Sequence, residues 1–522
     1  MAYLDSLLLE AKRSAPKEAK PAADAAPKPE EPSKKEDDDG EERLLVETYD
    51  DVRIYRVPSK NCYYYEVPAP RYFGEERSLI YSLIDVASNV INVDPKEVVT
   101  KEKIDKVYKE KMLEIIEQTP ELKVPMNSRE FYADVVLKEM FGFGVIDNLV
   151  KDDRLEEIMV IGPDKPVYVF HRKYEMMPTN IRYYSDNDIK RLIDRIARII
   201  GRRIDTQVPL LDARLPDGTR VNATLPPTSI DGSTLTLRKF RKDPYTVIDL
   251  IGYNTLNLEA AAFLWMATDG MGAKPANILI AGGTGSGKTT LLNTLCSFVP
   301  TTERIVTIED TAELSIPLSH WIRFETRPPG IEGTGEITMD MLVKNTLRMR
   351  PDRVIVGEIR GAEGFTMFTA MNTGHDGCFG TIHANSARET LTRITAPPIS
   401  VPEIMIGALT FIVVQKRIHD RRKGVIRRVT EIAEVTPSGD EKNDIEIIYQ
   451  WDATKDMLEP TGVPPRYMQT LSSYTGLSRN AILDELEERK GILTELKSKG
   501  IRSMDEVCKQ TQSYTLKKAR KF

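Results

Sequence analysis

Apolar and polar residues alternate with two different periods in the first half of the chain. Residues 156–171 (EEIMVIGPDKPVYVFH) contain two apolar runs joined at residues 162–165, which predicts a β-hairpin. After Ser185, apolar residues recur at helical spacing until Gly201, which predicts a helix with Ser185 as its N-cap. RVNATLPP and STLTLRKF predict further strands. This half is therefore expected to be mixed α/β.

The second half has a similar alternation of elements. Residues 277–281 (NILIA) predict a buried strand, and residues 290–298 predict a helix that ends before Pro300. RIVTIEDTAEL and DRVIVGEIRGAE predict two more apolar strands with acidic residues at their ends. Near the C-terminus, apolar residues on one face predict a helix over residues 479–497. A capping box at Ser503 and Glu506 predicts the start of another.

Breaks in these patterns predict the domain organisation. Residues 14–43 contain Ala, Pro, Lys and acidic residues but no aromatic or β-branched residue, so they cannot bury enough apolar surface to fold. The preceding segment, residues 3–11, is mildly amphipathic and is either a docking peptide or an unanchored terminus. The predicted divisions are a disordered acidic tail over 1–45, an α/β domain over 46–240, a linker over 241–246, a second α/β domain over 247–437 and a mainly helical extension over 438–522.

Composition argues against several classes of protein. The 73 Lys and Arg against 79 Asp and Glu give a net charge of -6, whereas dedicated nucleic-acid binders usually have a basic balance. No apolar run approaches the ~20 residues that cross a bilayer. The four cysteines are far apart and form no CxxC pair, which favours a reducing, cytoplasmic location.

The stretch GGTGSGKTT predicts a phosphate-binding loop. It satisfies G-x-x-x-x-G-K-[ST] between a predicted strand and a predicted helix. Backbone N–H groups and the helix N-terminus would hold phosphate oxygens, Lys288 would lie near the β- and γ-phosphates, and the Thr289 hydroxyl would bind Mg²⁺. ATP and Mg²⁺ are therefore the expected cofactors. The predicted nucleotide-binding residues are Gly282, Gly283, Thr284, Gly285, Ser286, Gly287, Lys288, Thr289 and Thr290.

Acidic residues end two of the predicted strands that follow the loop. Glu309 and Asp310 end the first, and Glu358 ends the second. The ends of parallel strands converge on the ligand crevice, so these carboxylates are expected to face the phosphates. An ordinary Walker B motif has Asp directly after the apolar run, where this chain has Gly357. Glu358 is thus predicted to position or polarise the attacking water, with Glu309 a second candidate for water or metal.

The stretch TGHDGCFGTIHANS admits two interpretations. His375, Cys378 and His383 are residue types that bind zinc, so the stretch taken alone suggests a metal site. Zinc requires a fourth ligand, and no further Cys or His is close in sequence. The other interpretation is a segment that serves the phosphate site, which makes zinc the less favoured prediction.

The order of these four motifs resembles one family. GGTGSGKTT, TIEDTAEL, LRMRPDRVIVGEIRGAE and TGHDGCFGTIHANS are similar to the Walker A, Asp box, Walker B and His box of the secretion ATPases of type II and type IV secretion, type IV pili and the archaellum. RIHDRRKGVIRRVTEIAEV and ELEERKGILTELKSKGIRSMDEV resemble the archaeal branch, in particular archaellum and archaeal pilus ATPases.

The resemblance implies a fold, an assembly and roles for further residues. It implies a RecA-like P-loop ATPase domain preceded by a mixed α/β domain, with the subunits in a hexameric ring. Arg220 and Arg238 match the arginines that reach the phosphates from the N-terminal domain. His383 would sense the γ-phosphate or orient water, and His375 would couple that sensor to a neighbouring subunit. Weaker arginine candidates are Arg241, Arg348, Arg350 and Arg360.

The function expected on these grounds is a hexameric, Mg²⁺-dependent ATPase. It would power assembly of an archaellum or pilus-like filament, or protein secretion, through a polytopic membrane platform protein and other subunits of that machinery. It would lie in the cytoplasm, peripheral at the inner face of the membrane through these partners. The alternatives are a nucleic-acid translocase, which the charge balance disfavours, and an assembly scaffold that binds nucleotide with little turnover.

Overall fold

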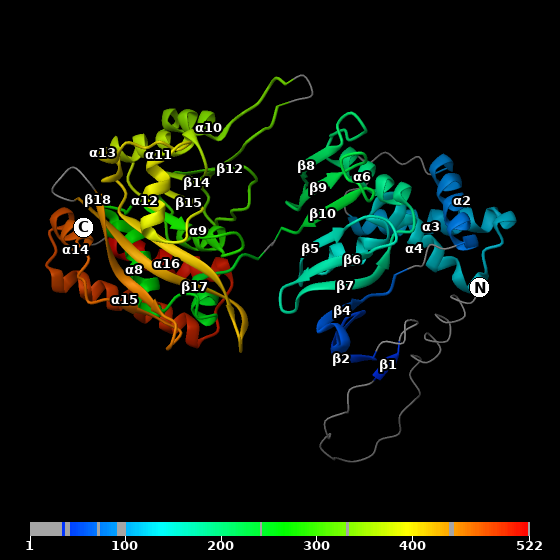
Figure 1. The fold of residues 1–522 in the computed structure, drawn as a ribbon, viewed down its shortest axis with the longest axis horizontal. Coiled ribbons are helices and arrows are strands. Elements are labelled where there is room, and N and C mark those ends of the chain that lie inside the picture. The colour runs from blue at the N-terminus through cyan, green and yellow to red at the C-terminus, as the bar shows by residue number, and fades with distance from the viewer. Residues whose placement is uncertain are drawn as a thin grey trace, which may run out of the picture. The chain divides into compact units, whose positions relative to one another are not determined.

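The chain divides into two compact units, Met1–Phe240 and Arg241–Phe522, each with its own sheet and core (Figure 1). The structure, a computed structural model, describes residues 34–36, 42–69, 74–90, 101–240, 243–329, 333–437 and 443–519. Most of the predicted acidic tail lies outside these residues. The first strand of any length begins at Glu42, a few residues before the predicted start of the folded part.

The first unit contains a ten-stranded, mostly antiparallel sheet in the order β1-β2-β3-β4-β7-β6-β5-β10-β9-β8. The predicted hairpin over residues 156–171 is confirmed as β5 and β6, and the two further strands as β9 and β10. The strands are β1 (Lys34–Glu36), β2 (Glu42–Tyr49), β3 (Val52–Val57), β4 (Cys62–Glu66), β5 (Leu155–Val160), β6 (Pro166–His171), β7 (Glu175–Arg182), β8 (Leu210–Arg214), β9 (Arg220–Thr224) and β10 (Thr234–Arg238).

The predicted helix after Ser185 is confirmed as α6 (Asp186–Ile199), which packs its apolar face on the sheet. Ser185 is the N-cap residue, as predicted, but its side chain makes no capping hydrogen bond; its carbonyl oxygen accepts from Asp188 N at 3.1 Å. A separate apolar cluster joins three other helices. The remaining helices of the unit are α2 (Gly74–Val90), α3 (Lys101–Gln118), α4 (Arg129–Phe141) and α5 (Asp147–Lys151).

The second unit contains a nine-stranded sheet in the order β13-β12-β14-β15-β11-β16-β17-β18-β19. The strands from β13 to β16 are parallel, and the last four form an antiparallel meander. This is the predicted RecA-like α/β fold. The strands are β11 (Ile278–Ala281), β12 (Ile305–Glu309), β13 (Trp321–Glu325), β14 (Arg353–Ile359), β15 (Phe379–Ile382), β16 (Phe411–Asp420), β17 (Gly424–Pro437), β18 (Asn443–Asp452) and β19 (Met457–Pro460).

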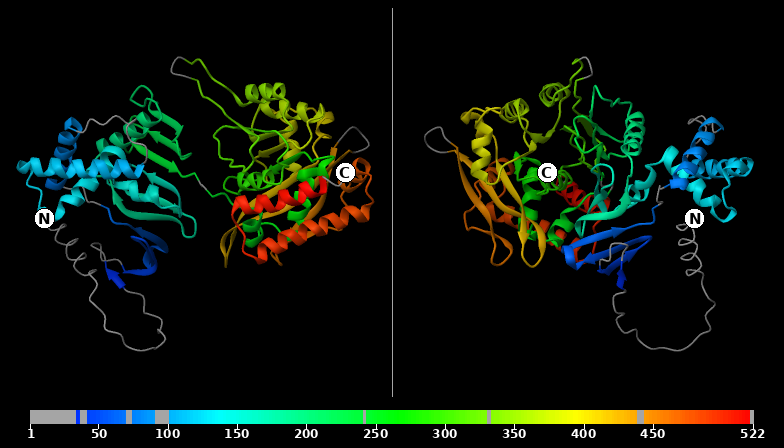
Figure 2. Two further views of the ribbon diagram at one scale, coloured as in Figure 1. Left: turned by 180° about the vertical axis from the view of Figure 1, so that it is seen from behind. Right: turned by 45° about the vertical axis from the view of Figure 1, so that its right-hand side comes forward.

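Helices cover both faces of this sheet, as the views in Figure 2 show. Along β11, Ile278 and Ile280 contribute to one core, and Leu279 and Ala281 contribute to the other, because successive side chains of a strand point to opposite faces. The first core is covered by α7 (Val247–Gly252), α8 (Leu258–Asp269), α9 (Lys288–Cys296), α14 (Tyr467–Thr475), α15 (Arg479–Ser498) and α16 (Met504–Ala519). The second is covered by α10 (Met339–Thr346), α11 (Ala362–Asn372), α12 (Ala387–Thr395) and α13 (Glu403–Ile406).

The C-terminal residues complete the second unit. The predicted division after residue 437 falls between β17 and β18, which pair with each other, and β18 contributes Ile448 and Tyr449 to the first core. The two predicted terminal helices are confirmed as α15 and α16. Their apolar faces cover the sheet, so residues 443–519 form a layer of the same fold.

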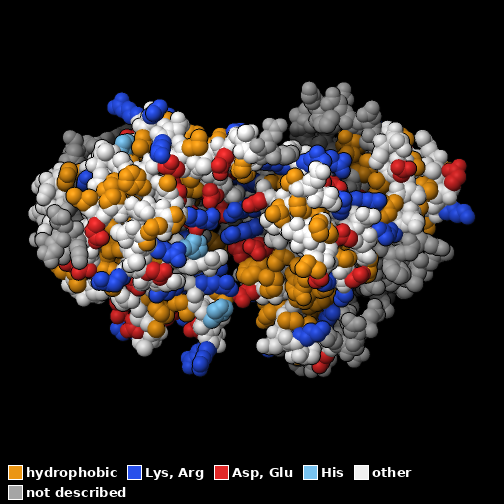
Figure 3. Space-filling view, turned by 45° about the horizontal axis from the view of Figure 1, so that its top comes forward, with side chains coloured by type: hydrophobic (Ala, Val, Ile, Leu, Met, Phe, Trp, Pro, Cys, Tyr) orange, Lys and Arg blue, Asp and Glu red, His pale blue; other side chains and the backbone are white. Residues whose placement is uncertain are grey.

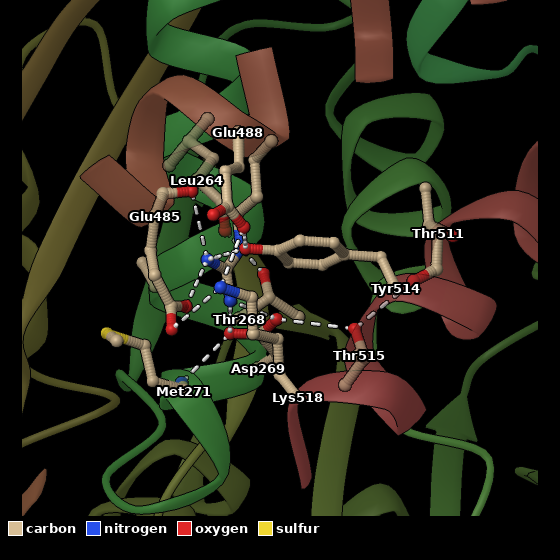
Figure 4. A network of polar contacts seen from close by, with 12 residues as sticks. Leu264, Thr268, Asp269, Met271, Glu485, Glu488, Thr511, Tyr514, Thr515 and Lys518 are labelled. Carbon is tan, nitrogen blue, oxygen red and sulfur yellow. Dashed lines mark hydrogen bonds and ion pairs between the residues drawn. The ribbon is translucent and has the colours of Figure 1, made fainter. Parts of the chain in front are cut away.

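A buried polar network fastens these helices to α8 (Figure 4). Arg489 of α15 contacts two carboxylates. Its Nη2 lies 2.9 Å from Asp269 Oδ2, and its Nη1 lies 2.9 Å from Glu485 Oε2. Its side chain is only 2% exposed and that of Asp269 is 0% exposed. The guanidinium also lies over the ring of Tyr514 from α16, 4.9 Å from its centroid. The C-terminal helices α15 and α16 thus share one buried charge with α8, which lies about 200 residues earlier in the chain.

Candidate functional site

The predicted phosphate loop lies between β11, in the centre of the parallel sheet, and α9. Gly285 and Gly287 have φ angles of 69° and 98°, which glycine adopts without strain. At Gly282 a Cβ would lie 2.3 Å from the carbonyl oxygen of Gln415, so no side chain fits there. The strand, loop and helix therefore have the order and the close packing that the motif predicted.

Lys288 lies folded over the loop. Its Nζ donates to the carbonyl oxygens of Gly282, at 2.9 Å, and Gly283, at 3.1 Å. Burial lowers its pKa, the charge of Glu358 opposes that effect, and the charge of Arg360 adds to it. Since Lys288 is 8% exposed, its ammonium group is partly desolvated and has a strong tendency to bind an anion.

Glu358 is the centre of a charged cluster beside the loop. Its Oε2 accepts from Arg360 Nη2 at 2.5 Å, and its Oε1 lies 2.9 Å from His383 Nε2. The second contact is close but is not aligned as a hydrogen bond, and Oε1 is buried without a donor among the described residues. Arg360 also bonds Asp310 Oδ2 at 3.2 Å. Two strand ends and the segment after β15 thus meet around one carboxylate.

This cluster fixes the protonation states of its members. Burial would raise the pKa of Glu358, but the Arg360 hydrogen bond and the charges of Arg360, His383 and Lys288 outweigh burial and lower it. Burial lowers the pKa of His383, and the Lys288 charge adds to that. A carboxylate with a free oxygen and a neutral imidazole therefore stand side by side at neutral pH.

Glu309 has a different environment from Glu358. It is 2% exposed, and its Oε1 accepts from the backbone N–H groups of Glu313, at 2.9 Å, and Leu314, at 3.1 Å. Burial raises its pKa to about 7. Its side chain packs against Gly357, where a Cβ would lie 3.0 Å from Glu309 Cγ. Glu309 thus occupies the space that an aspartate at position 357 would need.

The structure separates the two histidines of the TGHDGCFGTIHANS stretch. His383 directly follows β15 at the edge of the sheet that faces the loop, whereas His375 precedes β15 at the opposite edge. Cys378 is buried, its Sγ donates to His375 O at 3.2 Å, and burial raises its pKa to about 12. At about 3.3 Å per strand residue, the three side chains do not converge on one ion.

The arginine candidates lie in different places. Arg220 and Arg238 are directly opposite each other on β9 and β10, and Arg214 on β8 is opposite Arg220, so three arginines form one row across the first unit's sheet. Arg214 was not among the residues predicted from the sequence, because its position in the row follows from strand register. Arg360 belongs to the Glu358 cluster. Arg348 and Arg350 are exposed near the end of α10, and Arg241 lies outside the described residues.

The β16–β17 hairpin is a part of this site that was not predicted from the sequence. Arg427 Nε donates to the carbonyl oxygen of Gly285 at 2.9 Å. The basic run RIHDRRKGVIRR contains this residue, but nothing local shows that the run folds back onto the loop. Only the pairing of β16 with β11 brings it there.

The residues present fit a nucleoside triphosphate with Mg²⁺. Gly282 to Gly287 would hold the phosphates through their backbone, Lys288 would pair with the β- and γ-phosphates, and Thr289 in the first turn of α9 would bind the metal. Among the described residues, no group of three or more His, Cys, Asp and Glu side chains is placed to hold a metal ion without such a ligand.

Comparison with known proteins agrees with these features. The family model described as type II/IV secretion system protein matches residues 139–442. An uncharacterized protein of Methanocaldococcus jannaschii is 34% identical over 71% of this chain and 75% of its own length. A putative conjugal transfer protein of Mycobacterium tuberculosis is 33% identical over 62% of this chain and 92% of its own. The ATPase DotB of Yersinia pseudotuberculosis aligns over 71% of this chain and 92% of its own, at 17% identity and a TM-score of 0.41.

Proposed function

This chain belongs to the type II/IV secretion system protein family, and on that premise we propose that it is a Mg²⁺-dependent ATPase that powers assembly of an extracellular filament or protein secretion. The observation that carries the proposal is the meeting of Lys288 and Glu358 at one edge of the parallel sheet, with His383 beside them. A phosphate-binding loop alone binds nucleotide, but a carboxylate opposite it also provides for hydrolysis.

In this proposal Glu358 polarises the attacking water. Its Oε1 makes no hydrogen bond to the described residues, and its lowered pKa keeps it ionised. Neutral His383, next to that oxygen, orients the water or senses the γ-phosphate. Glu309 instead stabilises the turn after β12, because its Oε1 accepts hydrogen bonds from two backbone N–H groups of that turn. Mg²⁺, when bound, neutralises charge on the transferring phosphoryl group.

The arginine row of the first unit supports an assembly of several subunits. A planar, permanently charged guanidinium suits the charge spread over a transferring phosphoryl group. We assign Arg220 and Arg238, with Arg214 as a third member of the row, to the phosphates of a nucleotide bound at a subunit interface, as the family resemblance implies. A hexameric ring would arrange such sites in sequence around an axis. His375, at the far edge of the sheet, is available for contact with another subunit.

The partners in this proposal are a membrane platform protein and filament or secretion subunits. No helix in the described part of the chain combines the length and hydrophobicity that a membrane crossing requires. The archaeal-type motifs resemble those of archaellum and archaeal pilus ATPases, so the proposal keeps filament assembly and secretion as its two outcomes. On the face shown in Figure 3, Lys and Arg side chains are mixed with Asp and Glu, and this mixed surface favours protein partners over nucleic acid.

The test is ATP turnover as a function of assembly. Purified wild-type protein should hydrolyse ATP, and its specific activity should fall on dilution as rings dissociate. Lys288→Ala should bind no ATP. Turnover that DNA stimulates would favour a nucleic-acid translocase. Tight ATP binding by a ring without detectable turnover would favour a scaffold, and equal specific activity for a dilute monomer would contradict sites completed between subunits.

A further inference from the structure

The hairpin formed by β16 and β17 packs against the outside of the phosphate loop. Gln415, at the point where the hairpin leaves the sheet, is 1% exposed. A Cβ at Gly282 would lie 2.3 Å from its carbonyl oxygen, and a Cβ at Gly287 would lie 2.8 Å from its Nε2. The hairpin backbone therefore leaves no room for a side chain at Gly282, and Gln415 closes in on the loop at Gly287.

A β-bulge directs the hairpin toward the loop. Val414 pairs with Glu431 and Gln415 pairs with Val429, so Thr430 is an extra residue on β17. Bulges bend a strand and change the direction of the side chains that follow, and they occur often beside active sites. After this bulge, Arg417 and Arg427 are directly opposite each other.

Both arginines lie against Gly285. Arg427 Nε donates to the Gly285 carbonyl oxygen at 2.9 Å, and Arg417 Nη1 lies 3.7 Å from the place that a Cβ on Gly285 would take. The two terminal nitrogens of Arg427 make no hydrogen bond within the described part of the chain. A guanidinium with unused donors beside a phosphate loop can hydrogen-bond a phosphate oxygen or a hydroxyl group of the ligand.

The order of the strands decides which part of a nucleotide reaches this hairpin. In the sequence β14-β15-β11-β16, Glu358 and His383 follow strands on one side of β11, and the hairpin extends from the strand on the other side. A nucleotide bound over the loop with its γ-phosphate toward Glu358 therefore extends its α-phosphate and ribose toward β16.

We propose that Arg417 and Arg427 bind the α-phosphate and ribose end of a nucleoside di- or triphosphate, and that Arg427 also holds the Gly285 peptide in its ligand-binding orientation. The inference rests on the proposed function and adds residues that set nucleotide affinity. The two arginines belong to the hairpin on the other side of β11 from Glu358, so they are assigned to binding and not to the hydrolytic step.

The test separates affinity from turnover. In the full chain, Arg427→Gln and Arg417→Gln should each weaken ADP and ATP binding by about 10- to 100-fold, the range expected for losing a hydrogen bond to a charged group. The kcat at saturating ATP should stay within about threefold. Arg427→Lys should recover part of the affinity, because it keeps the charge but loses the planar donor. Arg422→Gln is the matched control, because Arg422 is exposed at the hairpin tip and this substitution removes the same charge as Arg427→Gln.

Inorganic triphosphate provides the second probe, because it occupies the phosphate loop but has no ribose or nucleoside-linked phosphate. Its binding should change no more in Arg427→Gln than in Arg422→Gln. The inference is overturned if Arg422→Gln loses as much ADP affinity, if triphosphate binding falls as much as ADP binding, or if kcat falls with unchanged affinity. Failure of the wild-type protein to bind ADP would contradict the proposed function itself. Arg417→Gln keeps the test decisive if Arg427→Gln does not fold, because Arg417 is exposed.

Discussion

Glu309 and Gly357, on the neighbouring strands β12 and β14, pack so closely that a Cβ on residue 357 would lie 3.0 Å from Glu309 Cγ. The relationship explains a departure from the ordinary Walker B motif. A side chain at position 357 would crowd Glu309, and Glu358, one residue later, is the acid that faces Lys288 and His383.

Introducing a side chain at this contact should destabilise the protein. Gly357→Ala is expected to lower the free energy of unfolding by about 1–3 kcal/mol, the usual cost of overpacking a closely packed contact. In a Glu309→Ala background the same change should cost clearly less, because the obstructing Cγ is gone. Denaturant unfolding of the four proteins of this cycle measures the coupling. Equal costs in both backgrounds would show that the contact does not restrict position 357.

Glu309 should make stability depend on pH. Burial raises its pKa from 4.5 to about 7, so the folded protein holds a proton that the unfolded chain releases. Its stabilising contribution is full below pH 4.5 and is lost as pH rises through 7, a loss of about 3 kcal/mol. Relative to Glu309→Gln, whose amide oxygen can accept the same backbone hydrogen bonds, the wild-type protein should therefore lose stability from pH 5 to pH 8. Parallel unfolding curves for the two proteins over that range would exclude a raised pKa.

Glu358→Gln should separate binding from hydrolysis. We expect ATP affinity within a few-fold of wild type and a kcat lower by at least about 100-fold, the usual contribution of a general base. Glu309→Gln is the matched control, since it replaces the other strand-end glutamate and should retain most turnover. Nucleotide titration and steady-state rates distinguish the two. If Glu309→Gln lost turnover and Glu358→Gln kept it, the roles would be reversed.

The two histidines of the TGHDGCFGTIHANS stretch should have different effects on turnover. His383→Ala should lower kcat, because His383 Nε2 lies 2.9 Å from Glu358 Oε1. Its lowered pKa also predicts a kcat that is flat above pH 7 and falls as acid protonates the imidazole. His375→Ala should leave basal nucleotide affinity unchanged and act only through assembly, measured by sedimentation of the ring. A loss of ADP affinity in His375→Ala would contradict its place at the far edge of the sheet.

The buried network of Figure 4 should be a large contributor to the stability of the second unit. Arg489→Met leaves Asp269 buried without its partner, and breaking a buried ion pair in this way costs about 3–5 kcal/mol. Adding Asp269→Asn should restore part of the loss, because the unpaired charge is removed. Lys499→Met is the control, since Lys499 and its partner Glu495 are each 60% exposed and the change should cost under about 0.5 kcal/mol. Additive losses in the double variant would rule out a coupled pair.

Local pattern was enough to predict many elements of this protein. The helix after Ser185, the hairpin over residues 156–171 and the terminal helix from Arg479 are present as predicted, because each depends on the spacing of apolar residues within one segment. The phosphate loop is predictable for the same reason. Its glycines, Lys288 and the helix that follows are contiguous in sequence, so their roles are read without knowing the rest of the fold.

Strand order and packing decided the rest. The sequence predicted Glu358 ahead of Glu309 and His383 ahead of His375 for the phosphate site, but only the order β14-β15-β11-β16 and the direction of β15 put Glu358 and His383 beside the loop and His375 at the far edge. Arg427 reaches Gly285 from 142 residues away for the same reason. The pairing of distant strands depends on the burial of both faces of the whole sheet, which no single segment of sequence specifies.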